Sequence, residues 1–301
     1  MSKSKDKRDI FYRKAKEEGW RARSAFKLLQ IDETFDLFNN VTRAVDLCAA
    51  PGSWSQVLAR KLIDEHSRIV AVDLQPMAPI DGVHTVQGDI TSQRTVDEVL
   101  NLFREGDEER LADLVVCDGA PDVTGLHDID DYIQGQLLLS ALAITASLLR
   151  PGGSFVAKIF RGRGAPRIYA RCLQLFREVA TAKPRASRNS SAEAFIVCRG
   201  FELPAGFVRG VGLAPMLEDD DEAALLERFD PQSVPFVACG DLSGFDADAN
   251  YDLDLAEGAT HYEPIRPTQP PTTPAYRAYL EAQSSSSGRR VVLDAETHEV
   301  T

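Results

Sequence analysis

Short apolar runs and amphipathic segments alternate along the first 200 residues of the chain. The continuous apolar runs predict buried strands at residues 44–47, 68–73, 84–86, 114–118, 154–159, 179–183 and 193–198. Apolar residues spaced three or four apart predict helices at residues 25–38, 53–62, 93–104, 131–149 and 166–177. Such alternation is typical of an α/β fold with a mostly parallel, doubly wound sheet and helices on both of its faces.

Two of these helices carry end signals. Ser24 stands directly before residues 25–38, where its hydroxyl is expected to cap the first turn. Residues 151–153, Pro-Gly-Gly, follow residues 131–149 and are expected to end that helix. In folds of this class, ligands bind beyond the carboxyl ends of the strands.

The alternation is lost after residue 200. Residues 218–222 are an acidic run, residues 267–274 are rich in proline, and residues 284–287 are all serine. Segments of this composition bury too little apolar surface to fold alone. We therefore expect them to be ordered only where they pack on the preceding domain or on a partner.

Charge divides the chain at similar points. The net charge is −12, but residues 201–301 hold 19 acidic and 6 basic residues, whereas residues 1–30 hold 4 acidic and 10 basic ones. We expect a basic segment at 1–23 that meets phosphate, a folded domain at 24–203, and an acidic, partly disordered extension at 204–301. A basic end that only adds solubility explains the N-terminal charge equally well.

The composition, with 44% hydrophobic and 27% charged residues, is that of a globular protein. No run of about 18 apolar residues occurs, so no membrane span is expected, and the N-terminus lacks the apolar core of a signal peptide. The five cysteines are odd in number and lack zinc-like spacing. Reduced thiols in the cytosol or nucleus, without a metal site, fit this pattern.

The loop at residues 48–52, Cys-Ala-Ala-Pro-Gly, joins a predicted strand to a predicted helix and is a candidate for ligand binding. Its small residues, including Gly52, allow backbone amides to approach a ligand closely. Trp54 follows this loop, and its side chain is expected either to pack against that ligand or to be buried in the core. An ordinary turn between strand and helix explains the loop equally well, and no G-x-G-x-x-G motif favours a dinucleotide.

Three acids follow neighbouring strands and favour a positively charged ligand that contains adenosine. Asp73 ends the second strand, where a carboxylate holds ribose hydroxyls; Asp89 follows the third, in reach of an adenine amino group; Asp118 ends the fourth. Carboxylates also stabilise a sulfonium and an ammonium group. Together with Gly52 and Trp54, these acids are the predicted cofactor contacts.

Three further charged residues stand in apolar surroundings. Lys158 falls within the strand at 154–159, where lysine is rarely buried without a partner, although a lysine at a strand end also reaches water. Glu193 begins an otherwise apolar strand. Lys27 lies on the helix at 25–38, where its charge needs a functional explanation only if the side chain points inward.

Lys27, Asp118, Lys158 and Glu193 resemble, in order and in local motif, the Lys-Asp-Lys-Glu tetrad of the FtsJ/RrmJ-type RNA 2′-O-ribose methyltransferases. The motifs are SAFKL around Lys27, CDGAPD around Asp118, VAK ending at Lys158 and SSAE ending at Glu193. The resemblance covers about residues 7–200. It implies a Rossmann-like class I methyltransferase fold, S-adenosyl-L-methionine as cofactor, and the four tetrad residues as the catalytic set.

The resemblance extends beyond that domain. Residues 236–248 and 267–271 resemble the C-terminal part of the eukaryotic cytoplasmic branch that methylates the tRNA anticodon loop, and the basic loop at 161–164 suits the same branch. This implies cytidine and guanosine 2′-hydroxyls of the tRNA anticodon stem-loop as acceptors, accessory protein subunits that select each site, and a cytoplasmic location.

Three alternatives were weighed against this reading. Methylation of rRNA or of an mRNA cap is the nearest, and the extension motifs argue against it. A non-catalytic adaptor is disfavoured by the complete tetrad. A nicotinamide-dependent oxidoreductase is disfavoured by the missing glycine motif.

Two roles remain open for Lys158. As a proton acceptor it must be neutral, which burial or the charge of Lys27 would bring about by lowering its pKa. As a cation it would orient the hydroxyl oxygen toward the methyl group. Asp118 is expected between the cofactor and Lys158, and Glu193 is expected to fix the position of the lysine.

RNA is expected to contact the basic N-terminal segment. There, Phe11, Tyr12 and Trp20 lie among arginines and lysines, so that base stacking and phosphate contacts are both available. These aromatic residues also suit packing of an N-terminal helix on the core, which is the better explanation for Trp20.

Overall fold

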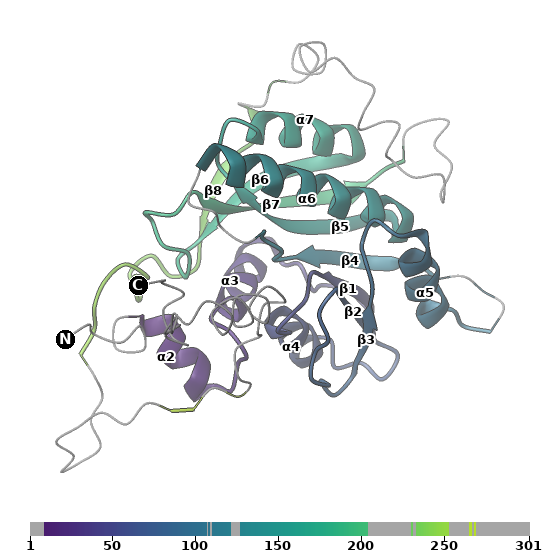
Figure 1. Ribbon diagram of the computed structural model, residues 1–301, viewed down its shortest axis with the longest axis horizontal. Coiled ribbons are helices and arrows are strands. Elements are labelled where there is room, and N and C mark those ends of the chain that lie inside the picture. The colour runs from purple at the N-terminus through teal and green to yellow at the C-terminus, as the bar shows by residue number, and fades with distance from the viewer. Residues whose placement is uncertain are drawn as a thin grey trace, which may run out of the picture.

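In the computed structural model, the chain forms an eight-stranded sheet with helices on both faces (Figure 1). The structure describes residues 9–106, 108, 110–121, 127–203, 230, 233–252, 265, 266 and 268. The predicted acidic run at 218–222 and serine run at 284–287 lie outside these residues. So does the proline-rich segment at 267–274, apart from Thr268.

The strands and helices follow the predicted segments closely up to residue 201. The strands are β1 (Arg43–Leu47), β2 (Arg68–Asp73), β3 (Val83–Gln87), β4 (Ala112–Cys117), β5 (Leu149–Phe160), β6 (Phe176–Pro184), β7 (Glu193–Phe201) and β8 (Phe236–Cys239). The helices are α2 (Ile10–Glu17), α3 (Ala25–Phe35), α4 (Ser53–Lys61), α5 (Gln93–Phe103), α6 (His127–Leu148) and α7 (Ala165–Leu175).

The strand order is β3-β2-β1-β4-β5-β7-β6-β8. Only β7 runs against the others, pairing antiparallel with both β5 and β6. The short connection at 185–192 accounts for this direction, because a parallel pair needs a much longer crossover. The prediction of a mostly parallel, doubly wound sheet is confirmed, and β1 and β4 meet where the strand order reverses.

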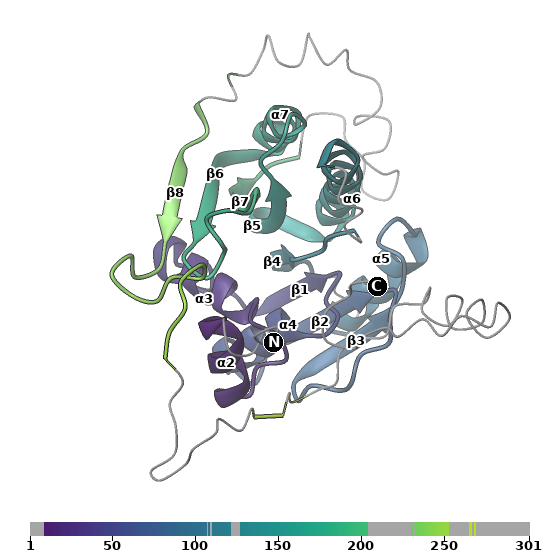
Figure 2. The ribbon, with the colours of Figure 1, turned by 60° about the vertical axis from the view of Figure 1, so that its left-hand side comes forward.

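Each face of the sheet is covered by its own set of helices (Figure 2). One buried cluster joins the sheet to α5, α6 and α7 through residues such as Phe103, Leu142 and Ile168. A second cluster joins the other face to α3 and α4 through Leu28 and Val57. The apolar periodicity of these helices therefore matches two buried faces.

Several element ends differ from the predictions. The helix α6 begins at residue 127 rather than 131, and residues 151–153, expected to end it, lie within β5, which begins at residue 149 rather than 154. The helix α3 differs at both ends. Ser24 does not cap α3: its backbone is helical, with φ −63°, and its hydroxyl lies 2.7 Å from the hydroxyl of Ser53. The helix also ends at Phe35 rather than residue 38, because Asp36 adopts a left-handed conformation with φ 51°. Here the contact between two helix starts outweighs local capping.

The strand β8 was not predicted from the sequence. It pairs in parallel with the outer edge of β6, so part of the C-terminal extension completes the sheet. This strand has only four residues and is largely exposed, so it gives no recognisable apolar run in the sequence. Beyond it, residues 240–252 turn toward α2, where Ala247 and Tyr251 pack against Ile10 and Phe11.

Candidate active site

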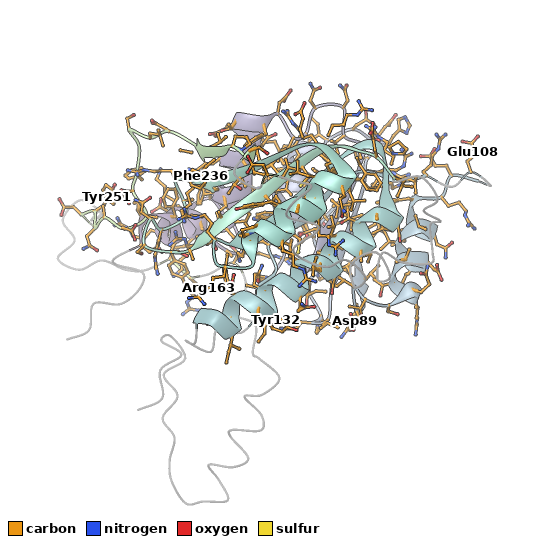
Figure 3. All side chains as sticks on the ribbon, turned by 90° about the horizontal axis from the view of Figure 1, so that it is seen from above. Asp89, Glu108, Tyr132, Arg163, Phe236 and Tyr251 are labelled. Atoms are coloured by element: carbon orange, nitrogen blue, oxygen red, sulfur yellow. The ribbon has the colours of Figure 1, made fainter. Side chains whose placement is uncertain are left out.

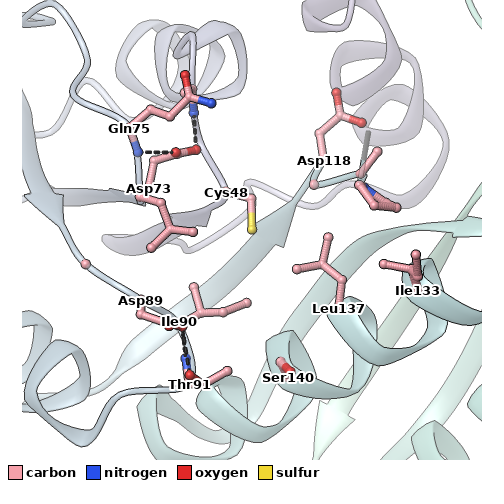
Figure 4. A pocket seen from close by; sticks show the side chains of 16 residues that line it. Cys48, Asp73, Gln75, Asp89, Ile90, Thr91, Asp118, Ile133, Leu137 and Ser140 are labelled. Atoms are coloured by element: carbon pink, nitrogen blue, oxygen red, sulfur yellow. Dashed lines mark hydrogen bonds between the residues drawn. The ribbon is translucent and has the colours of Figure 1, made fainter. Parts of the chain in front are cut away.

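A cavity of about 520 Å³ opens beyond the carboxyl ends of β1 to β4 (Figure 4). Its polar wall contains Asp73, Asp89 and Asp118, the three acids predicted from the sequence. Ile90 and Leu137 form part of its apolar wall. The volume and the mixed lining are those of a small-molecule site.

Backbone and side-chain donors fix two of these carboxylates. Asp73 accepts hydrogen bonds from the amides of Ala50, at 2.8 Å, and Gln75, at 2.7 Å. Asp89 accepts from the amide and the hydroxyl of Thr91, both at 2.8 Å, and these bonds hold the pKa of Asp89 below its usual range. Carboxylates held in this way keep further lone pairs for the hydroxyl and amino groups of a ligand.

Gly52 and Trp54 do not line this cavity. The indole N–H of Trp54 donates to the carbonyl of Ser24 at 2.8 Å, and its ring packs against Phe195 with centroids 5.5 Å apart. Of the two positions that the sequence allowed for Trp54, the structure shows the core. The prediction that Trp54 contacts the cofactor is not supported by this geometry.

Gly52 serves the shape of the loop at 48–52. Its φ is 101°, and an added Cβ would lie 2.9 Å from a guanidinium nitrogen of Arg21. Arg21 itself donates to the carbonyls of Pro51 and Pro79, at 2.9 and 2.7 Å. The loop is therefore clamped from the N-terminal segment, a role that the sequence analysis missed because it assigned these basic residues to RNA.

The four tetrad residues form one connected group beside the cavity. The Nζ atom of Lys158 lies 2.8 Å from Oδ1 of Asp118 and 3.7 Å from Oε2 of Glu193. The Nζ atom of Lys27 lies 2.7 Å from Oε1 of Glu193. Lys27, on α3, does point inward. The structure thus brings together four charged residues, although the first and the last, Lys27 and Glu193, are 166 positions apart in the sequence.

Burial and charge have opposite effects on this group. Burial by itself would lower the pKa of Lys158, but Asp118 and Glu193 outweigh it, and the net pKa is raised. Burial would raise the pKa of Glu193, but Lys27 and Lys158 lower it to about 2. Lys158 is therefore an ammonium and Glu193 a carboxylate at neutral pH.

Two further side chains hold the tetrad and were missed in the sequence analysis. Gln134, buried on α6, donates to the carbonyls of Gly119 and Lys158 at 3.1 and 3.0 Å, and so joins the ends of β4 and β5. Ser187 donates to Oε1 of Glu193 at 2.7 Å. A lone Gln and a lone Ser carry no sequence signal for such roles.

The extension supports the loop that contains Ser187. Asp248 accepts from the amide of Asn189 at 2.6 Å, and Asp246 pairs with Arg185 at 2.9 Å. These contacts hold both ends of the segment before Glu193. Part of the acidic charge after residue 200 is therefore matched to basic residues of the domain.

Asp46 is a buried carboxylate that the sequence analysis did not select. It lies within β1, is 1% exposed, and accepts a 2.6 Å hydrogen bond from the hydroxyl of Ser55. Burial raises its pKa to about 7, and the nearby charges of Asp118 and Asp73 add to this effect. It stands just behind the loop at 48–52.

The N-terminal aromatic residues lie mostly inside the protein. Phe11 and Trp20 are each 5% exposed, so the packing on the core that was preferred for Trp20 is confirmed, and the expectation that Phe11 stacks on RNA is wrong. Arg13 donates to the carbonyl of Asp252 at 2.9 Å, and Lys14 lies 4.5 Å from the ring centroid of Phe245. The helix α2 thus binds the C-terminal extension with groups that were expected to bind RNA.

The described residues offer neither a metal site nor a membrane-spanning helix. No group of three or more His, Cys, Asp or Glu residues there has an arrangement that could hold a metal ion. None of the described helices has the length and apolar character needed to cross a membrane.

Comparison with known proteins gives a consistent result. A family model described as FtsJ-like methyltransferase matches residues 20–201. A tRNA (cytidine(32)/guanosine(34)-2′-O)-methyltransferase from Homo sapiens is 56% identical over 277 residues, which cover 91% of this chain and 82% of the human protein. A protein of the same name from Schizosaccharomyces pombe is 52% identical, covering 94% of this chain and 97% of its own length.

Among solved structures, a ribosomal RNA methyltransferase from Plasmodium falciparum is similar in fold. It superposes with a TM-score of 0.53 at 24% identity, covering 60% of this chain and 98% of that chain. At this identity the likeness supports the fold alone. It agrees with the class I methyltransferase architecture expected from the sequence.

Proposed function

The chain belongs to the FtsJ-like methyltransferase family, and from this premise we propose that it methylates ribose 2′-hydroxyls of cytidine and guanosine in the tRNA anticodon loop. The family confirms the predictions of a methyltransferase and of S-adenosyl-L-methionine as its cofactor. The choice of tRNA rests on the names and the high coverage of the two relatives.

One observation carries the proposed reaction: Asp118 belongs both to the cavity wall and to the tetrad. A ligand in the cavity and a hydroxyl beside Lys158 would therefore lie next to each other, with only the Asp118 carboxylate between them. Methyl transfer requires this arrangement, because sulfur, methyl carbon and hydroxyl oxygen must lie in line.

Asp73, Asp89 and Asp118 would hold the cofactor. Their carboxylates suit the hydroxyl, amino and cationic groups of S-adenosylmethionine, and Ile90 and Leu137 suit the faces of its adenine. When bound, the cofactor supplies an electrophilic methyl group. The residues of this chain then determine where the acceptor oxygen is held.

For Lys158 we infer the orienting role rather than the role of proton acceptor. Its raised pKa keeps it protonated between Asp118 and Glu193. An ammonium donates a hydrogen bond to the acceptor oxygen and directs the free lone pair toward the methyl group. The hydroxyl proton then passes to solvent water rather than to Lys158. Lys27 and Glu193 act by fixing Lys158.

The remaining expectations are kept as proposals. Residues 24–203 would form the methyltransferase domain, residues 1–23 would add RNA contacts through partly buried side chains such as Tyr12 and Lys16, and residues 204–301 would form the extension. Accessory protein subunits would select the nucleotide. A cytoplasmic location is supported by five cysteines that form no disulfide.

The proposal is tested by incubating the purified full chain with labelled S-adenosylmethionine and either total tRNA or rRNA, followed by mapping of the 2′-O-methyl groups. We expect label in anticodon loops of tRNA. Label in rRNA or in cap structures, with anticodon loops unmodified, would favour the alternative substrates. The purified chain lacks the proposed accessory subunits. The assay is therefore repeated in a cell extract that supplies them but lacks the endogenous enzyme.

A further inference from the structure

Phe236 is a large aromatic side chain at an exposed edge. It begins β8, which pairs with the outer edge of β6, and it is 54% exposed. Phe236 belongs to the extension, outside the residues 20–201 that match the family model. Its position therefore is not explained by the family fold.

Arg161 covers part of the ring of Phe236. Its guanidinium carbon lies 5.1 Å from the ring centroid, within the range for a cation over an aromatic face. Arg161 is itself exposed, and its amide donates to the carbonyl of Ala192 at 2.9 Å, next to Glu193. The pair is thus anchored three residues beyond Lys158, at the end of the catalytic strand.

A second pair of the same kind shows that this one is unusual. Arg60 lies 3.7 Å from the ring centroid of Trp20, but Trp20 is 5% exposed, so that pair is closed against the core. Arg161 and Phe236 are instead both exposed, so a further flat group can approach this pair from the solvent.

The loop at 161–164 carries two arginines and contacts one carboxylate: Asp131 accepts from the amide of Gly164 at 3.1 Å and lies against Gly162. Arg163 is exposed on the same loop, and in the part of the chain that the structure describes neither arginine pairs with a carboxylate. Lys183 lies close enough that Arg161 contributes to lowering its pKa, after the larger effect of burial. In Figure 3, Phe236 and Arg163 both lie on the side of the molecule away from Glu108. This surface suits a polyanion.

We propose that Arg161, stacked on Phe236, forms a platform for an unpaired base of the substrate RNA next to the methylated nucleotide. The proposal rests on the proposed function and adds a substrate contact to it. Unpaired bases stack on aromatic rings and on guanidinium planes, whatever their sequence. A platform at the end of β5 would hold the strand while Lys158 orients the 2′-hydroxyl.

The test measures binding of the full chain to a fluorescent tRNA anticodon stem-loop and single-turnover methyl transfer to the same RNA. The variants Arg161→Lys, which keeps charge without the plane, and Phe236→Leu should each weaken binding about 5- to 30-fold, as expected for the loss of base stacking. Phe236→Tyr, which keeps the ring, should stay within about twofold of the wild type. Arg163→Lys is the matched control on the same loop and should also stay within about twofold.

The salt dependence of binding separates stacking from charge. Arg161→Lys keeps the number of positive charges, so the slope of affinity against salt should match the wild type while the affinity falls. Equal losses in Arg161→Lys and Arg163→Lys would overturn the platform. The platform would also be overturned if Arg161→Lys and Phe236→Leu bound the RNA as tightly as the wild type. A loss of binding that appears only when a protein partner is present would overturn it as well.

Failure of the platform is distinguishable from failure of the proposed function. Absence of tRNA methylation by the wild type, under conditions where it methylates another RNA, contradicts the proposed function itself. Normal tRNA methylation by the wild type, together with unchanged variants, contradicts only the platform.

Discussion

Asp46, which is buried, and Glu193, which is half-buried, are carboxylates on two sides of the same site, and their pKa values are shifted in opposite directions. Asp46 lies behind the cofactor loop with Ser55 as its hydrogen-bond donor, and burial raises its pKa to about 7. Glu193 lies between Lys27 and Lys158, which overcome its burial and lower its pKa to about 2. The difference is the presence of cations, since both side chains are removed from water.

This contrast divides the site by charge. The region around Asp46 collects acids, namely Asp46, Asp73 and Asp118, and is suited to a cationic ligand. The region around Glu193 contains matched charges and is suited to holding a neutral hydroxyl in position. Asp118 belongs to both regions, because it lines the cavity and pairs with Lys158.

The largest expected effect on the rate of methyl transfer comes from removing Lys158, a cation of the region around Glu193 that the region around Asp46 lacks. Lys158→Ala should lower the methyl-transfer rate by about 10²- to 10³-fold, the usual range for the loss of a preorganised hydrogen-bond donor at the reacting oxygen. Binding of S-adenosylmethionine should change less than about threefold, since Lys158 does not line the cavity. Transfer of labelled methyl and calorimetric binding measure the two quantities separately.

A surface lysine provides the matched control. Lys61 pairs with Asp32 at 3.2 Å and is 43% exposed, so Lys61→Ala should leave both quantities unchanged. Near-normal turnover by Lys158→Ala would remove Lys158 from the reaction. Loss of cofactor binding by the same variant would show that the two regions are not separate.

Asp46→Asn should remove a pH dependence of stability. The unfolded chain loses the proton of Asp46 near pH 4, but the folded chain keeps it until about pH 7, so this contribution is full below pH 4 and is lost as the pH rises to 7. The loss amounts to at most about 4 kcal/mol. Asparagine retains the Ser55 contact without a charge, so urea unfolding should show a variant more stable than wild type at pH 8 and similar at pH 4. Parallel pH curves for the two proteins would contradict the buried, protonated state of Asp46.

Glu193→Gln should have the opposite pH signature. The folded pKa of Glu193 lies below its unfolded value, so its contribution is full above about pH 4.5 and is lost as the pH falls toward 2. We expect the variant to be less stable than the wild type by about 3 kcal/mol at pH 7, with the difference shrinking toward pH 3. Urea unfolding at these two pH values is the measurement. A difference that is constant with pH would rule out the charge-based explanation.

The smallest expected effect concerns the hydrogen bond from Ser187. Ser187→Ala should raise the pKa of Glu193 and lower the rate of methyl transfer about two- to fivefold, since a hydrogen bond of this kind contributes about 1 kcal/mol. Ser243→Ala is the matched control, because that hydroxyl bonds only Asp241 in an exposed turn of the extension. Equal effects of both changes would mean that the loss comes from the extension in general.

The sequence predicted the sheet for a clear physical reason, whereas the tetrad as a set was implied by the family resemblance. Strands buried on both faces give continuous apolar runs, and a charge within such a run, as at Lys158, is conspicuous. Asp73, Asp89 and Asp118 were predicted because acids at strand ends meet at one edge of a parallel sheet. These features depend on local pattern and topology alone.

The features that the sequence analysis missed depend on contacts between distant segments. Asp46 was overlooked because, in the sequence, it resembles the other acids at strand ends. Only the structure shows that it is buried with the hydroxyl of Ser55, and not a cation, as its partner. Phe11 is buried because α2 packs against Ala247 and Tyr251, and β8 pairs with the outer edge of β6. The basic segment was expected to meet phosphate and the extension to pack on the domain or on a partner, but in the described residues α2 and the extension contact each other.

The most direct test of the central claim is the pH dependence of single-turnover methyl transfer to tRNA by the wild-type protein. If Lys158 acts as an ammonium that orients the hydroxyl, the rate should not rise with pH above neutrality and should fall once Lys158 loses its proton at high pH. A rate that increases about tenfold per pH unit from pH 7 to 9 in the wild type, but not in Lys158→Arg, which stays charged, would instead show that a neutral Lys158 accepts the proton, and would contradict the account.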